Sequence, residues 1–174
     1  MVKTETVILG GGCFWCTEAV FRMFKGIIST TPGYAGGNKS NPTYEQVCSG
    51  NTGHAEVLKV EYDADTISLD KILEIFFSMH DPTSADRQGA DVGSQYRSMI
   101  LYESEKQKYL IQKFVKIEQK KFSRSIITEV KKLSAFYPAE DHHKDYYAKN
   151  PLQPYCLLVI APKVRKIRKE FCIK

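Results

Sequence analysis

The chain has 174 residues, of which 43% are hydrophobic and 26% are charged, and its formal net charge is +5. This length and composition fit one globular domain over residues 1–174, large enough to bury a core without disulfides. The cysteines are odd in number and irregular in spacing, which excludes a secreted disulfide framework and predicts reduced thiols in a cytoplasmic protein: Cys13, Cys16, Cys48, Cys156 and Cys172.

The beginning of the chain offers one short apolar run, Val7 to Leu9, with Lys3 and Glu5 close by. A secretory signal peptide needs roughly 7–15 apolar residues, and a membrane-spanning helix needs about 20. We therefore expect neither a signal peptide nor a contact with a membrane.

The predicted elements begin with a buried strand over residues 5–9, which three glycines end, and a helix over residues 13–24. Residues 33–37 and 41–47 are expected to form a loop region with a short helical turn. The next strand is predicted over residues 54–62, where apolar and polar side chains alternate.

The middle of the chain predicts a helix over residues 68–79, for which Ser68 is a plausible N-cap. A long polar loop over residues 80–95 follows, of the kind that usually carries function. A strand over residues 95–102 and a long amphipathic helix over residues 104–121 come next.

The last part of the chain predicts a strand over residues 125–130 and a short helix over residues 138–149. The connections between elements are partly hairpin-like and partly crossovers. This mixture predicts an α+β fold with a mixed or antiparallel sheet, not a doubly wound parallel one.

The segment GGGCFWC, residues 10–16, places two thiols and two aromatic rings directly behind three glycines. Unpaired backbone N–H groups at a helix start favour the thiolate and lower a thiol pKa, so Cys13 is a candidate nucleophile. The alternative is that Cys13 is a small buried hydrophobic residue. Cys16 can share its helical face within disulfide range, and this pair indicates redox exchange rather than zinc binding, because no second pair of ligands follows.

The two aromatic residues after this thiol, and Glu56 farther along the chain, also have two interpretations each. Phe14 and Trp15 either fill the core or form a cage for a small apolar group beside the sulfur. Glu56 shares one face of its strand with Leu58 and Val60. Burial there would raise its pKa and make it a proton donor near neutral pH, whereas a position at the strand end would let it reach solvent.

Together these stretches resemble the A-type peptide methionine sulfoxide reductases from end to end: GGCFWCTEAVF, GYAGG, NPTYEQVCSGNTGHAEV, DPTSADRQGADVGSQYRS and AEDHHKDYY. The combination of GCFW, TGHAE and QYRS is highly specific. The resemblance implies a ferredoxin-like α+β fold with long wrapping loops. It also implies thiol-dependent reduction of methionine-(S)-sulfoxide, in proteins and as the free amino acid, without a metal or a prosthetic cofactor.

The same resemblance implies roles for single residues. Cys13 matches the nucleophile, and Glu56 matches the acid that protonates the sulfoxide oxygen. Tyr44 and Tyr96 match the two hydroxyls that hold this oxygen, and Asp91 matches a carboxylate of the same polar site. Phe14 and Trp15 match the pocket for the substrate's methyl group.

The cycle of this family implies that Cys13 becomes a sulfenic acid, condenses with a second thiol to a disulfide, and is regenerated by thioredoxin or another dithiol. Many members carry the resolving cysteine in a glycine-rich C-terminal tail. Here the tail has no glycine, and a strand-like apolar run follows Cys156. Cys16 is therefore the leading resolving thiol, and the alternatives are Cys156, Cys172 and Cys48.

Two other functions suit parts of the sequence. The C-x-x-C pair alone would suit a thioredoxin-like disulfide exchanger, which would not need Glu56, Tyr44 or Tyr96. Residues 163–174 carry six Lys or Arg and one Glu, which would suit an arm that binds nucleic acid or an acidic partner. Apolar residues at helical spacing favour a terminal helix with a solvated face instead. We expect a monomer that meets oxidised proteins, free methionine sulfoxide and thioredoxin, but no nucleic acid.

Overall fold

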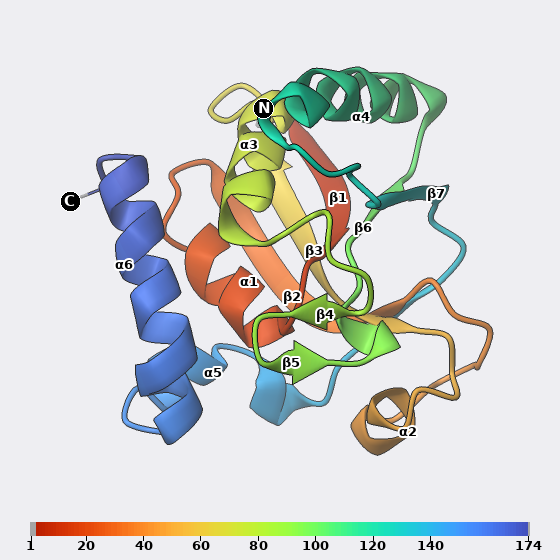
Figure 1. The fold of residues 1–174 in the computed structure, drawn as a ribbon, viewed down its shortest axis with the longest axis vertical. Helices are drawn as coiled ribbons and strands as arrows, with labels where there is room; N and C mark the ends of the chain where they lie inside the picture. The colour runs from red at the N-terminus through yellow and green to blue at the C-terminus, as the bar shows by residue number, and fades with distance from the viewer. Residues whose placement is uncertain (1–2, 174) are drawn as a thin grey trace.

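The protein is known from a computed structural model that describes residues 3–173, and a six-stranded sheet lies at its centre (Figure 1). The strand order is β7-β6-β1-β3-β2-β8. The strands are β1 (Thr4–Gly10), β2 (Ile27–Ala35), β3 (Ala55–Asp63), β6 (Met99–Tyr102), β7 (Glu129–Lys132) and β8 (Phe136–Pro138). Neighbouring strands are antiparallel except β6 and β7, which are parallel. The predicted mixed sheet is thus confirmed.

Four of these strands form the ferredoxin-like unit that the resemblance implied. Helix α1 (Phe14–Phe21) connects β1 to β2, and α3 (Leu69–Met79) connects β3 to β6. Each crossover leaves room for one antiparallel strand between the two that it joins, which gives the order β6-β1-β3-β2. The main core joins one face of the sheet to α1 and α3, with completely buried side chains such as Val7 and Val60.

The other elements cover the edges and ends of this unit. The helices are α2 (Tyr44–Cys48), α4 (Glu105–Glu118), α5 (Tyr146–Lys149) and α6 (Ala161–Glu170). Short turns and a two-stranded hairpin complete the chain: β4 (Arg87–Gln88), β5 (Asp91–Val92), η1 (Ser94–Tyr96), η2 (Gln119–Lys121), η3 (Asp141–His143) and the π-helical turn η4 (Cys156–Ile160). Figure 1 shows α6 running beside α1. Among residues 3–173, no helix is both long and apolar enough to cross a membrane.

Several predicted elements are confirmed. The helix predicted over residues 68–79 is α3, and the Ser68 hydroxyl caps it by accepting a hydrogen bond from the Lys71 N–H at 3.2 Å. The basic C-terminal segment forms α6, because Val164 and Ile167 are buried against the core while most of its charged residues face solvent. This segment is therefore the terminal helix that its apolar spacing favoured.

The loop predicted around residues 33–37 is wrong, because residues 27–35 form the long strand β2. Pro32 and Gly33 read as loop formers in the sequence. Pro32 pairs with Leu58 of β3 and lies at the sheet edge just beyond the β8 pairing at Gly33, where its carbonyl accepts a hydrogen bond from the Ala139 N–H at 2.9 Å. A proline that cannot donate a hydrogen bond is tolerated at such an edge.

Other boundaries also differ. The helix predicted over residues 138–149 is divided into η3 and α5, because Asp145 adopts a left-handed backbone with φ of 57°. The strand-like run after Cys156 is the π-helical turn that leads into α6. The strands predicted over residues 95–102 and 125–130 begin later, at Met99 and Glu129.

Candidate active site

The site begins where β1 ends. Gly12 has φ of +94°, and a Cβ atom there would lie 3.0 Å from the Cβ of Gln88, so the turn needs glycine for both its backbone and its packing. Cys13 is the N-cap of α1, with a non-helical φ of −59° and ψ of 126°. Its side chain is 7% exposed. The glycines therefore allow close packing around the thiol rather than leaving open room beside it.

Glu56 lies beside this turn on β3, as the alternation of its strand predicted. It is 2% exposed, and its Oε2 atom accepts a hydrogen bond from the Phe14 N–H at 3.1 Å. Burial raises the pKa of this carboxyl to about 8, and the hydrogen bond only partly offsets that effect. At neutral pH, Glu56 is therefore mostly protonated and can donate a proton next to the backbone of Cys13.

Two tyrosines, Tyr44 and Tyr96, lie close enough to the same carboxyl for its charge to act on their hydroxyls. Burial raises the pKa of Tyr44 and of Tyr96, and the charge of Glu56 adds to the shift in both cases. The charge of Cys13 also raises the pKa of Tyr96. Glu140 fixes the start of α2 by accepting a hydrogen bond from the Tyr44 N–H at 2.9 Å. Glu56, Tyr44 and Tyr96 thus interact with one another, and all three are neutral hydrogen-bond donors near pH 7.

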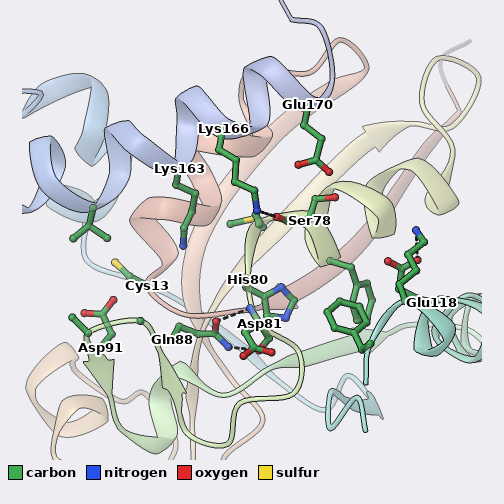
Figure 2. Close-up of a pocket in the computed structure, with 17 residues that line it drawn as sticks. Cys13, Ser78, His80, Asp81, Gln88, Asp91, Glu118, Lys163, Lys166 and Glu170 are labelled. Atoms are coloured by element: carbon green, nitrogen blue, oxygen red, sulfur yellow. Dashed lines mark hydrogen bonds and ion pairs between the residues drawn. The ribbon is translucent and has the colours of Figure 1, made fainter. Parts of the chain in front are cut away.

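Asp91 approaches the thiols from the β4–β5 hairpin. Cys13 and Asp91 line one end of a groove with a volume of about 650 Å³ (Figure 2). The Oδ2 atom of Asp91 accepts a hydrogen bond from the Tyr155 hydroxyl at 2.6 Å, and this hydroxyl lies 4.0 Å from the Cys16 sulfur. Sequence reasoning missed Tyr155, because no local pattern connects residues that are 64 positions apart.

The two aromatic residues after Cys13 have different surroundings. Phe14 is 1% exposed and packs in a buried cluster with Tyr34, so it belongs to the core. Trp15 is half-buried and stacks on Tyr146 with ring centroids 3.7 Å apart. The Trp15 indole N–H donates a hydrogen bond to Nδ1 of His143 at 3.1 Å, which fixes the ring orientation. Of the two rings, only Trp15 leaves part of its surface accessible.

Three sulfur atoms share one apolar cluster, those of Cys13, Cys16 and Cys156. Burial raises the pKa of Cys13 well above its usual value, and a hydrogen bond to Cys16 raises it further. The same hydrogen bond lowers the pKa of Cys16 to about 7 against the effect of burial, and Lys163 also contributes. The prediction that the helix start lowers the pKa of Cys13 is therefore wrong, because burial of the thiol outweighs that effect.

The two remaining cysteines lie apart from these three. Cys48 and Cys172 are exposed and lie outside this cluster, and all five cysteines are free. In the part of the chain that the structure describes, no group of three or more His, Cys, Asp or Glu side chains is arranged to hold a metal ion.

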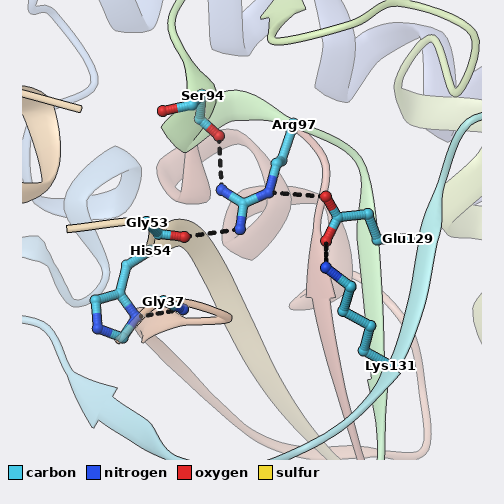
Figure 3. Close-up of polar contacts among 7 residues, drawn as sticks. All are labelled: Gly37, Gly53, His54, Ser94, Arg97, Glu129 and Lys131. Carbon is cyan, nitrogen blue, oxygen red and sulfur yellow. Dashed lines mark hydrogen bonds and ion pairs between the residues drawn. The ribbon is translucent and has the colours of Figure 1, made fainter. Parts of the chain in front are cut away.

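Arg97 connects three segments of the chain next to the site (Figure 3). Its guanidinium donates hydrogen bonds to the carbonyl oxygens of Ser94 at 2.9 Å and Gly53 at 2.8 Å, and to Glu129 at 3.2 Å. These contacts tie η1, which carries Tyr96, to the loop that leads into β3. Sequence reasoning did not single out Arg97, although it lies in the QYRS stretch.

A ferredoxin-like sheet that places a buried neutral carboxyl near two interacting thiols indicates a thiol-dependent redox enzyme. The model of the peptide methionine sulfoxide reductase family matches residues 5–174, so the chain belongs to this family.

Curated and solved relatives agree with this membership. The peptide methionine sulfoxide reductase MsrA of Sulfolobus acidocaldarius is 54% identical over 167 residues, covering 96% of this chain and 95% of that protein. The crystal structure of reduced Mxr1 from Saccharomyces cerevisiae superposes with a TM-score of 0.84 and 36% identity, covering 88% of this chain and 90% of that one. Mxr1 in complex with Trx2 matches with a TM-score of 0.60 and 26% identity, covering 83% and 85%.

Proposed function

We propose that this chain reduces methionine-(S)-sulfoxide to methionine, in proteins and as the free amino acid, and so repairs oxidised proteins. The observation that carries the proposal is the neutral Glu56 carboxyl, which accepts a hydrogen bond from the residue next to Cys13. We also propose that the chain acts as a monomer and forms one domain; the match of the family model to residues 5–174 supports the single domain. Five free thiols support a reducing compartment, the cytoplasm.

The first step of the reaction needs both an acid and a nucleophile. Sulfoxide sulfur is a poor electrophile until its oxygen receives a proton. Glu56 gives that proton while Tyr44 and Tyr96 donate hydrogen bonds to the same oxygen. The Cys13 sulfur attacks the sulfoxide sulfur and forms an S–S bond. The protonated oxygen then moves from the methionine sulfur to the Cys13 sulfur as this S–S bond breaks, which releases methionine and leaves a sulfenic acid on Cys13. Trp15, supported by Phe14, receives the methyl group of the substrate, and Asp91 belongs to the same polar site.

The charge that Cys13 needs comes from the thiol pair. Because the two thiols share a hydrogen bond, the pair loses its first proton near pH 7 and the charge exchanges between the two sulfur atoms. The ratio of the two forms does not depend on pH, so a constant fraction of the singly ionised pair carries the reactive Cys13 thiolate.

Cys16 then resolves the sulfenic acid. Its thiol displaces water from Cys13 and forms a disulfide, and thioredoxin returns both sulfurs to thiols by exchange. The non-helical backbone of Cys13 supports this pairing, because the strain of a disulfide within a regular helix turn is reduced when one end lies outside the helix. Cys156 is the alternative in the same cluster, while Cys172 and Cys48 are exposed and outside it.

Thioredoxin is proposed as the partner because the related Mxr1 has been crystallised in complex with Trx2. The steps above use side chains of this chain and an external dithiol. We therefore propose that no prosthetic cofactor takes part.

The test is an assay without reductant. The wild-type enzyme should release about one methionine per chain from the S epimer of a methionine sulfoxide peptide and none from the R epimer. Cys13→Ser should release none, whereas Cys172→Ser, which removes an exposed thiol, should behave as wild type. Methionine release by Cys13→Ser would refute the assignment of the nucleophile.

A further inference from the structure

The groove beside Cys13 is larger than the reacting group of the proposed substrate requires. Its volume is about 650 Å³, and it extends from Cys13 and Asp91 to Glu118 at the end of α4. Figure 2 shows α6 along one wall and Gln88 on the opposite one. Because a substrate sulfur must reach the Cys13 sulfur, groups attached to that substrate can enter the groove at its Cys13 end.

Most charges along the groove already have partners among residues 3–173. Glu118 contacts Lys121 at 2.8 Å, and Asp81 contacts Arg124 at 3.1 Å. Asp91 accepts the hydrogen bond from the Tyr155 hydroxyl. These groups are satisfied without a substrate.

Lys163 differs from these groups. It is half-buried on α6, and its side chain extends into the groove at the end where Cys13 lies (Figure 2). Within residues 3–173 it forms no ion pair with a carboxylate, whereas Lys166 on the next turn donates a hydrogen bond to the Ser78 carbonyl at 3.1 Å. Glu170, the acidic residue of α6 that lines the groove, follows two helical turns later, about 10 Å along the axis. The Lys163 charge also lowers the pKa of both Cys16 and His80, which agrees with an ammonium group near these two side chains.

We propose that Lys163 forms a subsite for a carboxylate that the substrate carries next to its oxidised methionine side chain. This inference rests on the proposed function. The carboxylate is either an acidic side chain beside the methionine sulfoxide in a peptide or the α-carboxylate of the free amino acid. A half-buried cation without a partner gains from an incoming anion, because the groove screens their attraction less than bulk water does. Lys163 thus selects among substrates, in addition to its effect on the pKa of Cys16.

The experiment compares kcat/KM for peptides with Glu, Gln or Lys next to the methionine sulfoxide, with dithiothreitol as the reductant so that thioredoxin docking plays no part. Wild type should prefer the Glu peptide to the Gln peptide by about 3–10-fold at low salt, and less at high salt. Lys163→Met should bring this ratio to about one, and Lys163→Glu should favour the Lys peptide. Lys169→Met, on the exposed face of α6, is the matched control and should keep both the wild-type ratio and the wild-type activity.

A second arm compares free methionine sulfoxide with its carboxamide. Loss of discrimination by Lys163→Met in this arm alone identifies the α-carboxylate as the ligand, and loss in the peptide arm alone identifies the acidic side chain. Wild-type ratios near one in both arms, or ratios unchanged in Lys163→Met, would overturn the subsite. If wild type releases no methionine even from the Gln peptide, the proposed function itself fails, and this outcome is distinct from the others.

Discussion

The two sides of the Cys13 sulfur differ in their access to water. On one side, Glu56 is 2% exposed and its raised pKa keeps the carboxyl mostly neutral near pH 7. On the other side, a groove lined by charged residues such as Lys163 and Asp91 opens to solvent. Low polarity stabilises a neutral acid, whereas charges persist where water reaches them. A substitution can therefore change the proposed proton donor without changing the proposed selection of substrates, and the reverse also holds.

Removing the second sulfur is expected to have the largest effect. Cys16→Ser should still release about one methionine per chain without reductant, because Cys13 and Glu56 remain, but more slowly at pH 7, because the thiol pair that ionises there is lost. Turnover with thioredoxin should then stop, since the sulfenic acid has lost its leading resolving thiol. Methionine release measured with and without thioredoxin checks this outcome. Normal turnover of Cys16→Ser, abolished by adding Cys156→Ser, would transfer the resolving role to Cys156, which lies in the same cluster.

Replacing Glu56 tests the buried side of Cys13 without changing the groove. Glu56→Gln keeps the shape and the acceptor for the Phe14 N–H but cannot protonate an oxygen. The single-turnover rate should fall by roughly 10²–10⁴-fold, the usual contribution of a general acid. The loss should be equal for peptides with Glu, Gln or Lys beside the methionine sulfoxide. A loss below threefold would remove Glu56 from this role.

A smaller effect is expected at the turn that joins the two sides. Gly12→Ala should lower the free energy of unfolding by roughly 2–4 kcal/mol, from a strained backbone and from contact with Gln88. Gly89→Ala is the matched control, because Gly89 has φ of +60° but no atom within 4 Å of an added Cβ. It should cost only about 1 kcal/mol. If urea unfolding shows the same loss of free energy for both variants, the contact with Gln88 contributes nothing to the effect of Gly12→Ala.

Local signals in the sequence were sufficient for part of this site. Alternation placed Glu56 on the buried face of β3, and the glycine run placed Cys13 at the start of α1. Both signals depend on a few neighbouring residues. The same holds for α3, whose cap and apolar period lie within one segment.

Properties that depend on distant parts of the chain could not be predicted in this way. The raised pKa of Cys13 follows from burial under the C-terminal helix and from its hydrogen bond to Cys16, and a helix-start argument does not contain either effect. Tyr155, which precedes the π-helical turn, reaches Asp91 across 64 positions of the chain, so only the folded structure brings them together. Strand β2 was missed because Pro32 is compatible with a strand only where no neighbouring carbonyl needs its missing N–H, and distant residues 138–139 set this condition.

The dependence of the single-turnover rate on pH tests the central claim most directly. Methionine formation requires the singly ionised thiol pair, which forms near pH 7, together with protonated Glu56, whose pKa is about 8. The wild-type rate should therefore rise towards pH 7, stay highest between pH 7 and 8, and fall about tenfold per pH unit above pH 8. Glu56→Gln should lack the falling limb. A wild-type rate that continues to rise from pH 8 to 10 would contradict proton donation by Glu56, because only the thiolate would then limit the reaction.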